Sequence, residues 1–154
     1  MAKGDETVGQ VMSKDVLAVN LNTNAKDCAK AMMKKGVSCA VITEAGTAVG
    51  IVTERDLVSK VLAESIEASK VLVRDIMSTP LITTTPDAPL VGAAEVMAQY
   101  RIRRLVVIDS SGALSGIVTA GDIARTLAEK QQYRDATLNA MARYSEGGDS
   151  GPYQ

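Results

Sequence analysis

An internal duplication is the feature that most restricts how this chain can fold. Residues 50–56 read Gly-Ile-Val-Thr-Glu-Arg-Asp, and residues 116–122 read Gly-Ile-Val-Thr-Ala-Gly-Asp. Upstream, residues 8–13 (VGQVMS) answer residues 73–78 (VRDIMS). The spacing between the copies grows by one residue at the turn 109–112, where a duplicated unit tolerates a length change. The chain therefore uses one supersecondary unit of about 60 residues twice, and we expect function where the copies meet.

The composition is that of an ordinary globular protein. The 154 residues are 46% hydrophobic, which suffices for one compact core made by two copies packed together. A net charge of -1 and the scarcity of aromatic residues argue against nucleic-acid binding and against an anionic membrane surface. No apolar run is long enough to cross a membrane, and the N-terminus lacks the apolar core of a signal peptide. We expect a cytoplasmic protein.

The residue inventory closes the usual routes to catalysis. There is no histidine, which removes the commonest general acid-base group and the commonest transition-metal ligand. Cys28 and Cys39 fall in apolar segments and are predicted to be buried thiols in a reducing compartment. No Walker-type or zinc-protease motif is present. We predict no catalytic residues and no metal site; an enzyme working at Thr-x-x-Asp is the less favoured alternative.

Hydrophobic periodicity predicts the same element order in each copy, a helical turn followed by β-α-β-β-α. In the first copy the elements are expected at residues 7–12, 16–19, 25–35, 39–43, 48–52 and 56–63. In the second they are expected at 72–77, 81–85, a helix capped by Asp87, 105–108, 114–118 and a closing helix that carries Ile123 and Leu127. Asn22 or Thr23 is a plausible N-cap for the helix 25–35. The last two strands of each copy are almost continuously apolar, which predicts burial on both faces.

The predicted fold class is α/β (α+β), with two pseudo-symmetric units and a C-terminal helical extension. The first unit is expected at residues 7–64, the linker at 65–71 and the second unit at 72–130. Residues 131–145 continue the closing helix with a Tyr/Ala face, which we interpret as an oligomer contact or as a cover for the groove. Residues 146–154 have the composition of a disordered tail.

The repeated Thr-x-x-Asp is the strongest candidate for a binding site. Thr53 and Thr119 fall where a strand ends and a helix begins, and Asp56 and Asp122 lie in the first turn of that helix. One interpretation is a capping box that needs no ligand. The other is a site in which the helix N-terminus receives a phosphate and the carboxylate accepts hydrogen bonds from a ribose diol. The recurrence of the motif in both copies favours the second.

These motifs resemble a pair of CBS domains, the Bateman module, over about residues 7–130. The resemblance is carried by Gly-h-h-Thr-x-x-Asp (h, hydrophobic) in both copies, by the opening h-Met-Ser, by the element order and by residues 100–109 (YRIRRLVVID). One departure is that the proline usual in the middle strand is replaced by Ala40 and Leu105. The resemblance implies two units packed through their sheets, with two clefts that bind AMP, ADP or ATP, or an adenosyl compound such as S-adenosylmethionine or NAD.

The family pattern carries over to particular positions of this chain. The phosphate and ribose would be held by Thr53 and Asp56 in one copy, and by Thr119 and Asp122 in the other. The positions expected to line the base are Val16, Leu17, Ala18, Val37 and Ser38 in the first copy, and Leu81, Ile82, Thr83, Ile102 and Arg103 in the second. Arg103 or Arg104 can reach a cleft and pair with phosphate, and Arg55 is a further phosphate candidate. The copies differ at these arginines, which predicts that the two clefts are not equivalent.

The leading hypothesis is a regulatory sensor that binds adenine nucleotide and signals through a partner protein or its own oligomer. The resemblance implies a homodimer. The alternative is a CBS-type interaction or scaffold subunit whose clefts are vestigial.

Overall fold

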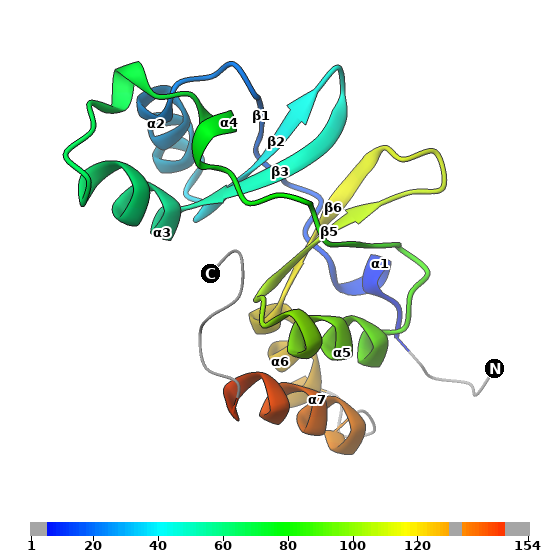
Figure 1. The fold of residues 1–154 in the computed structure, drawn as a ribbon. Helices are drawn as coiled ribbons and strands as arrows, with labels where there is room; N and C mark the ends of the chain where they lie inside the picture. Colours follow the sequence, from blue (N-terminus) through cyan, green and yellow to red (C-terminus); the bar gives the residue numbers. More distant parts are fainter. Residues whose placement is uncertain (1–5, 130–133, 147–154) are drawn as a thin grey trace. The chain divides into compact units, whose positions relative to one another are not determined.

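The computed structural model describes residues 6–129 and 134–146 of the chain (Figure 1). By contact, the chain divides into two compact units. One comprises Asp15–Leu81 and is called the β1–β3 unit. The other joins residues 6–14 to the described residues from Ile82 onward and is called the β4–β6 unit. Each unit has its own three-stranded sheet.

The β1–β3 unit follows the predicted element order. Its elements are β1 (Ala18–Asn20), α2 (Ala25–Lys35), β2 (Cys39–Glu44), β3 (Thr47–Thr53), α3 (Glu54–Leu57), the π-helical turn η1 (Val58–Leu62), the short 3-10 turn η2 (Ala68–Lys70) and α4 (Val73–Ile76). The helix predicted at 25–35 is confirmed at both ends. The predicted first strand is displaced by up to two residues, and the closing helix begins two residues earlier than expected and continues as η1.

The β4–β6 unit repeats the arrangement and adds a helix. Its elements are α1 (Val8–Val11), β4 (Thr83–Thr84), α5 (Leu90–Tyr100), β5 (Arg104–Ile108), β6 (Leu114–Thr119), α6 (Ala120–Glu129) and α7 (Arg134–Glu146). The strand expected at 81–85 is reduced to two residues at the edge of its sheet. The mixed α/β class and the duplicated three-stranded sheets are confirmed.

The two sheets have the same topology and the same irregularity. In each, the short first strand pairs in parallel with the middle strand, which pairs antiparallel with the last strand. The register shifts between Ile42 and Thr43 in one sheet and between Val107 and Ile108 in the other, which are matching positions. Burial on both faces is confirmed, since consecutive residues of the middle and last strands are fully buried. Register places Thr53 opposite Cys39, at the start of the middle strand.

The segment that opens each repeat is called its lead-in, and it packs on the sheet of the other repeat. The Met77–Ser78 segment of the second repeat crosses Gly50 of the first, and Ser78 forms two backbone hydrogen bonds with Ile51. A Cβ on Gly50 would lie 2.5 Å from Met77 Sδ, which is too close for any side chain to be accommodated without movement. The motif glycine is therefore needed for close approach of the lead-in from the other repeat.

The reverse exchange occurs in the other unit. A Cβ on Gly116 would lie 2.5 Å from the carbonyl oxygen of Ser13, which belongs to the first repeat. Ser13 also exchanges two backbone hydrogen bonds with Ile117. Each compact unit consequently contains the sheet of one repeat and the opening Met-Ser of the other.

Two helix starts differ from those predicted from the sequence. Asn24, rather than Asn22 or Thr23, caps α2, and its side chain accepts from Asp27 N–H at 2.8 Å. Asp87 does not cap α5, which follows Pro89 as N-cap with no side-chain cap. The Leu90 N–H instead donates to the carbonyl of Glu6 at 3.0 Å. A backbone partner from a distant lead-in satisfies the helix end that a local cap was expected to satisfy.

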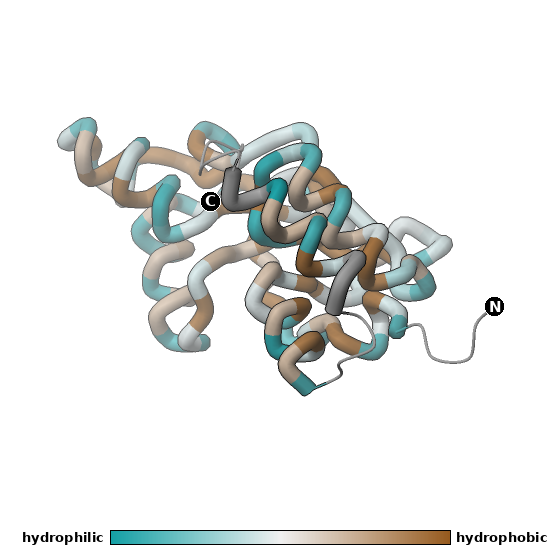
Figure 2. Tube along the Cα trace, turned by 90° about the horizontal axis from the view of Figure 1, so that it is seen from below, coloured by the Kyte–Doolittle hydropathy of each residue, from teal (hydrophilic) through white to brown (hydrophobic). Residues whose placement is uncertain are grey.

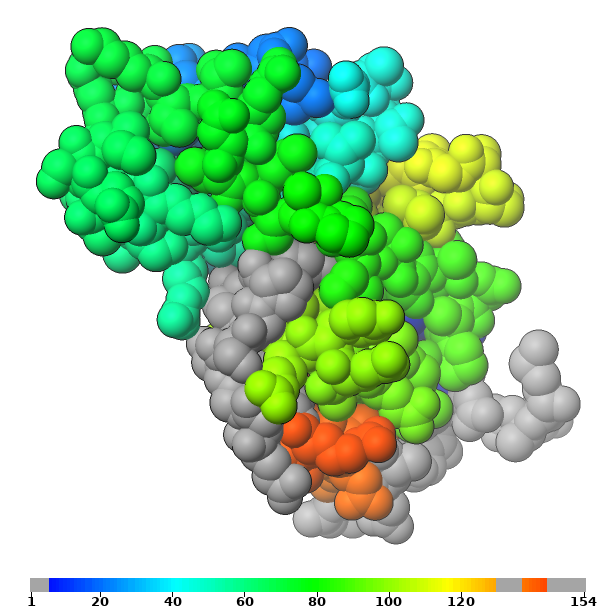
Figure 3. All heavy atoms as spheres, viewed as in Figure 1, coloured from blue at the N-terminus to red at the C-terminus, as the bar shows by residue number. Residues whose placement is uncertain are grey.

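The C-terminal helix packs within its own unit. Helix α6 covers Ala120–Glu129 and α7 covers Arg134–Glu146, and the predicted continuation of the closing helix through residues 130–133 lies outside the described residues. Helix α7 packs chiefly against α5, with Thr137 and Ala140 buried, and Figure 3 shows its orange and red atoms against the yellow-green atoms of α5. Part of the helix that was interpreted from the sequence as an oligomer contact or a cover for the groove is therefore buried within its own unit. The predicted tail at 146–154 lies outside the described residues, except for Glu146.

The helices turn apolar faces inward. Figure 2 shows hydrophobic and hydrophilic stretches alternating along the trace of the helices. In α2, Cys28 and Met32 are buried, while Met33 is 79% exposed. This difference leaves apolar surface on the outside of the β1–β3 unit.

Candidate functional site

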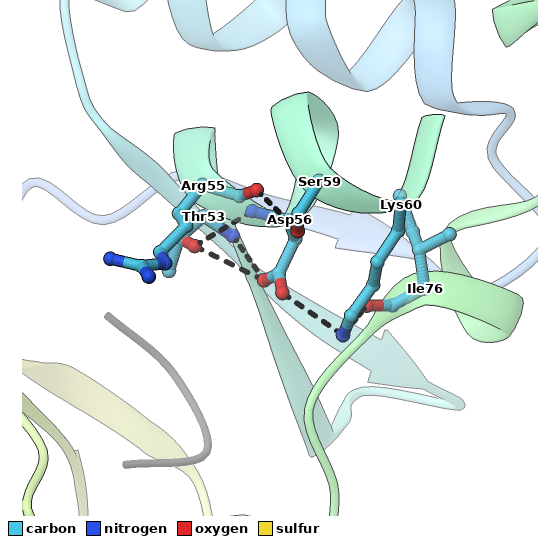
Figure 4. Close-up of polar contacts among 6 residues, drawn as sticks. All are labelled: Thr53, Arg55, Asp56, Ser59, Lys60 and Ile76. Carbon is cyan, nitrogen blue, oxygen red and sulfur yellow. Dashed lines mark hydrogen bonds and ion pairs between the residues drawn. The ribbon is translucent and has the colours of Figure 1, made fainter. Parts of the chain in front are cut away.

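The turn from β3 into α3 holds Thr53 and Asp56 in reciprocal contact (Figure 4). The Thr53 N–H donates to Asp56 Oδ2 at 2.8 Å, and the Thr53 hydroxyl lies 3.1 Å from the same oxygen. The Asp56 N–H in turn lies 3.3 Å from Thr53 Oγ1. Both residues are buried, at 1% and 5% exposure. The capping box that one reading of the motif predicted is present.

The remaining oxygen of the same carboxylate faces a lysine. Lys60 Nζ lies 3.0 Å from Asp56 Oδ1, four residues along the chain. The same ammonium donates to the carbonyl of Ile76, the last residue of α4, at 2.8 Å. Both carboxylate oxygens of Asp56 thus have partners within the protein, and the lysine connects α3 and its continuation to α4 (Figure 4).

The second copy repeats the box but not the lysine. The Thr119 N–H donates to Asp122 Oδ2 at 2.9 Å, and the Asp122 N–H donates to Thr119 Oγ1 at 3.1 Å. Asp122 Oδ1 is paired with Arg125 of the same helix, whose side chain is 68% exposed. The position that matches Lys60 is Thr126, whose hydroxyl donates to the Asp122 carbonyl at 3.0 Å. The side chain of Asp122 is 18% exposed, against 8% for Asp56.

The predicted row of outward N–H groups at each helix start is largely engaged. The Glu54 N–H donates to the carbonyl of Ser38 at 3.0 Å, and the Ala120 N–H donates to the carbonyl of Arg103 at 2.9 Å. The third N–H of each helix is used by the capping box. An anion at these turns would therefore depend on hydroxyl groups and side-chain cations more than on N–H groups.

A polar groove adjoins the second box. It has a volume of about 410 Å³ and is lined by residues of α1 and α6 and their approaches. The lining residues are Glu6, Gln10, Val11, Ser13, Asp122, Arg125, Thr126 and Glu129. Its volume is within the range of about 300 to 1,000 Å³ that is usual for small-molecule sites. Asp122 is thus a binding candidate that reaches a groove, and the α1 residues beside it were not predicted.

A larger and more apolar groove lies in the β1–β3 unit, beside the start of α3. It measures about 650 Å³ and lies between α2 and the α3–η1 segment. Its lining comprises Ala29, Met32, Met33, Gly36, Val37, Ser38, Glu54, Leu57 and Val58. Two predicted base-lining residues, Val37 and Ser38, are therefore beside this groove, whereas Thr53 and Asp56 are not among its lining residues.

The other predicted residues divide by burial. Val16, Leu17, Leu81, Ile82 and Thr83 are half-buried, and Ala18 is exposed. Ile102 is fully buried, which makes its side chain part of the core. Contacts bring the carbonyl of Ser38 to the start of α3 and that of Arg103 to the start of α6, so these two residues lie at their respective Thr-x-x-Asp turns.

The arginines differ in exposure and in their place at the sheet. The side chain of Arg103 is exposed, and Arg104 is half-buried and pairs in register with Thr119. Arg55 is exposed beside the first box, where its carbonyl accepts from the Ser59 hydroxyl at 2.8 Å (Figure 4). Arg101 ends α5 in the left-handed conformation, at the position occupied by Gly36 in the first copy. A cation consequently lies beside each turn.

Within residues 6–129 and 134–146, no group of three or more Cys, Asp or Glu side chains is arranged to hold a metal ion. In the same ranges, no helix combines the length and apolar character that a membrane span requires.

Comparison with known proteins identifies relatives of this chain. The CBS domain family model matches residues 8–63 and 73–129. Uncharacterized protein MK0525 of Methanopyrus kandleri is 39% identical over 142 residues, which is 91% of this chain and 70% of that protein. Two relatives from Methanocaldococcus jannaschii match over shorter stretches. The match spans only 32% of the length of uncharacterized protein MJ1426 and 12% of the length of L-aspartate semialdehyde sulfurtransferase.

Solved structures with the same fold include two with adenosine-containing ligands. The CBS domain pair of protein MJ0100, in complex with 5′-methylthioadenosine and S-adenosyl-L-methionine, is 30% identical, with a TM-score of 0.74 over 82% of this chain and 98% of that one. CBSX2, a CBS-pair protein from Arabidopsis thaliana, in complex with AMP is 25% identical, with a TM-score of 0.69 over 82% of this chain and 98% of that one.

Proposed function

The chain belongs to the CBS domain family, and we therefore propose that it is a cytoplasmic regulatory protein that binds an adenosine-containing ligand at its Thr-x-x-Asp turns. The single observation that carries this proposal is the Asp122 carboxylate, which is fixed by a capping box yet lines a groove of about 410 Å³. A fixed carboxylate at a groove suits the two hydroxyl groups of a ribose. The adenosine ligands bound by MJ0100 and CBSX2 support the same class of ligand.

The roles of the surrounding residues follow from their chemistry. Asp122 would accept hydrogen bonds from the ribose, and the Thr119 hydroxyl would contact the phosphate. Arg103 or Arg104 would pair with the phosphate charge in this copy. In the first copy, Asp56 and Thr53 would have the same roles, with Arg55 as the cation. The adenine would rest on the half-buried residues that precede β1 and β4.

The output is proposed to be regulation rather than catalysis. The sequence has no histidine, and no cluster for a metal is found over the described ranges. A ligand-dependent change would therefore be read by another protein or by a second copy of this chain. A scaffold subunit with vestigial sites is the second candidate, and the internal pairing of Asp56 with Thr53 and Lys60 favours it for the first copy.

A homodimer is proposed through the apolar groove of the β1–β3 unit. The groove residues Met33 and Val58 are 79% and 55% exposed, and Leu62, four residues after Val58, is 73% exposed. Exposed lysines along α2 and the groove residue Glu54 give opposite charges on its two sides, which a two-fold contact would bring together. In the β4–β6 unit the matching positions are Ala98, Ala124 and Ala128, and there α7 packs on α5.

Titration calorimetry tests the ligand. We expect AMP, ADP, ATP, S-adenosylmethionine or NAD to bind the wild type, and Asp122→Ala to weaken that binding by about 10-fold or more, because a hydrogen bond to a charged group contributes roughly 1.5–3 kcal/mol. Asp122→Asn, which keeps the size of the cap, serves as the control for folding, and thermal unfolding checks each variant. If no such compound binds, or if neither Asp56→Ala nor Asp122→Ala alters binding, the proposal is wrong.

A further inference from the structure

Lys60 occupies the place at Asp56 that a ribose hydroxyl would need. Asp56 Oδ2 already accepts from the N–H of Thr53, and Oδ1 lies 3.0 Å from the Lys60 ammonium. The carboxylate is 8% exposed, so a ligand cannot add to this arrangement from solvent without displacing a partner. Figure 4 shows the ammonium between Asp56 and Ile76.

A second contact holds the lysine in position. Its ammonium donates to the carbonyl of Ile76 at 2.8 Å, at the C-terminal end of α4. A carbonyl at that end of a helical turn lacks an intrahelical donor and is a favourable partner for a cation. Displacement of Lys60 from Asp56 would disturb this contact too, so the lysine is harder to move than an ion pair with a single partner.

The second copy lacks this double contact. Its matching residue, Thr126, is uncharged and bonds to the backbone of its own helix. Asp122 pairs instead with Arg125, three residues away on the same helix and 68% exposed. An exposed pair of this kind contributes little free energy, so it yields readily to a ligand. Asp122 also lines the polar groove.

We propose that Lys60 closes the Asp56 site, so that an adenosine ligand binds first and more tightly at the Thr119–Asp122 turn. This inference rests on the proposed function. A site that is open for about a tenth of the time binds its ligand about tenfold more weakly than the open form does. Lys60 is thus a positioning residue that makes the two copies unequal, and occupation of the first site releases the contact between η1 and α4.

Calorimetry with AMP on the full chain tests the inference. We expect the wild type to show one tighter site and one site weaker by about tenfold or more. Lys60→Met retains the aliphatic stem but removes the charge, and should tighten the weaker site about tenfold. Arg125→Met, the matched control, should leave the weaker site unchanged. Asp122→Asn should remove the tighter site.

Amide hydrogen exchange gives a readout that needs no ligand. Met77 N–H donates to the carbonyl of Val73 within α4. Lys60→Met should speed exchange in residues 73–77, and Arg125→Met should not. If AMP binds at two sites of equal affinity and Lys60→Met changes neither affinity, this inference is overturned but the proposed function stands. Absence of AMP binding in every variant, together with no binding of the other adenosine compounds, would overturn both.

Discussion

Asp109 organises the turn between β5 and β6 through one carboxylate oxygen. Asp109 Oδ1 accepts hydrogen bonds from the Ser111 hydroxyl and from the N–H groups of Ser111 and Ala113. These contacts, led by the Ser111 side chain, hold the pKa of the Asp109 carboxyl below its usual value. This turn contains the extra residue that distinguishes the second repeat from the first, so the insertion has its own local stabilisation.

The Asp109 pKa predicts a pH effect on stability. Because the pKa is lowered in the folded protein, its contribution is present above the unfolded pKa of about 3.9 and is lost as the pH falls through the folded value. The free energy of unfolding of Asp109→Asn should therefore fall less than that of the wild type as the pH is lowered from about 5 to about 3. Urea unfolding at several pH values measures this. Ser111→Ala, which removes the leading cause, should be intermediate, and identical pH profiles in all three proteins would refute the prediction.

The residues of the candidate site were only partly predictable. The Thr-x-x-Asp spacing predicted the capping boxes because both partners lie within one helical turn. The role of Lys60 was not predictable, since a lysine in this position of a helix normally faces solvent. Its second partner, Ile76, lies sixteen residues further along the chain, in the lead-in of the second repeat. No local sequence pattern predicts where that lead-in packs. The binding role of the remaining predicted residues stays a prediction.

Among the elements, helices α2 and α5 both end at a residue in the left-handed conformation, but the type of that residue differs. Helix α2 ends at Gly36 with φ 71°, and α5 ends at Arg101 with φ 55°. Glycine adopts this conformation without cost, whereas other residues carry a penalty of roughly 1–2 kcal/mol. The second repeat carries that penalty at Arg101, whose side chain is thereby placed at the approach to β5.

Gly36→Ala should reduce the free energy of unfolding by about 1 kcal/mol. A Cβ at this position meets nothing within 4 Å, so backbone conformation is the sole cause expected. Gly92, inside α5, provides the matched control because its Cβ would also meet nothing, at ordinary helical geometry. Gly92→Ala should stabilise the protein by about 0.5–1 kcal/mol. Denaturant unfolding of both variants compares the two, and equal signs would contradict this account.

Element existence was predictable where the pattern was local, and element ends were not. The apolar spacing in residues 25–35 gave α2 correctly because its face packs on its own sheet. The start of α5 was predicted wrongly because its first N–H donates to the carbonyl of Glu6, which lies more than eighty residues away in the sequence. Contacts of that range leave no periodic trace in either segment.

For the whole molecule, the proposed dimer predicts a selective effect of surface charge. Val58→Glu or Met33→Glu places a carboxylate in the apolar groove of the β1–β3 unit and should convert a dimer to a monomer, since an unpaired charge is costly to bury. Size-exclusion chromatography with light scattering reports the mass. Leu138→Glu is the control, because this residue is 46% exposed on α7, outside the groove. A monomeric wild type at tens of micromolar, or three variants that all stay dimeric, would rule out this interface.

The exchanged lead-ins have a consequence for how such a protein can be inherited. A gene fragment cut between the repeats would encode the sheet of one repeat together with a Met-Ser segment that packs on the sheet of the other repeat. The motif glycine of that fragment would have lost the segment it contacts. Neither half could be moved alone into a new protein without losing the strand-like contact at Ile51 or Ile117. Recombination that preserves folding must therefore transfer both repeats together, which makes the pair the smallest portable piece of this sequence.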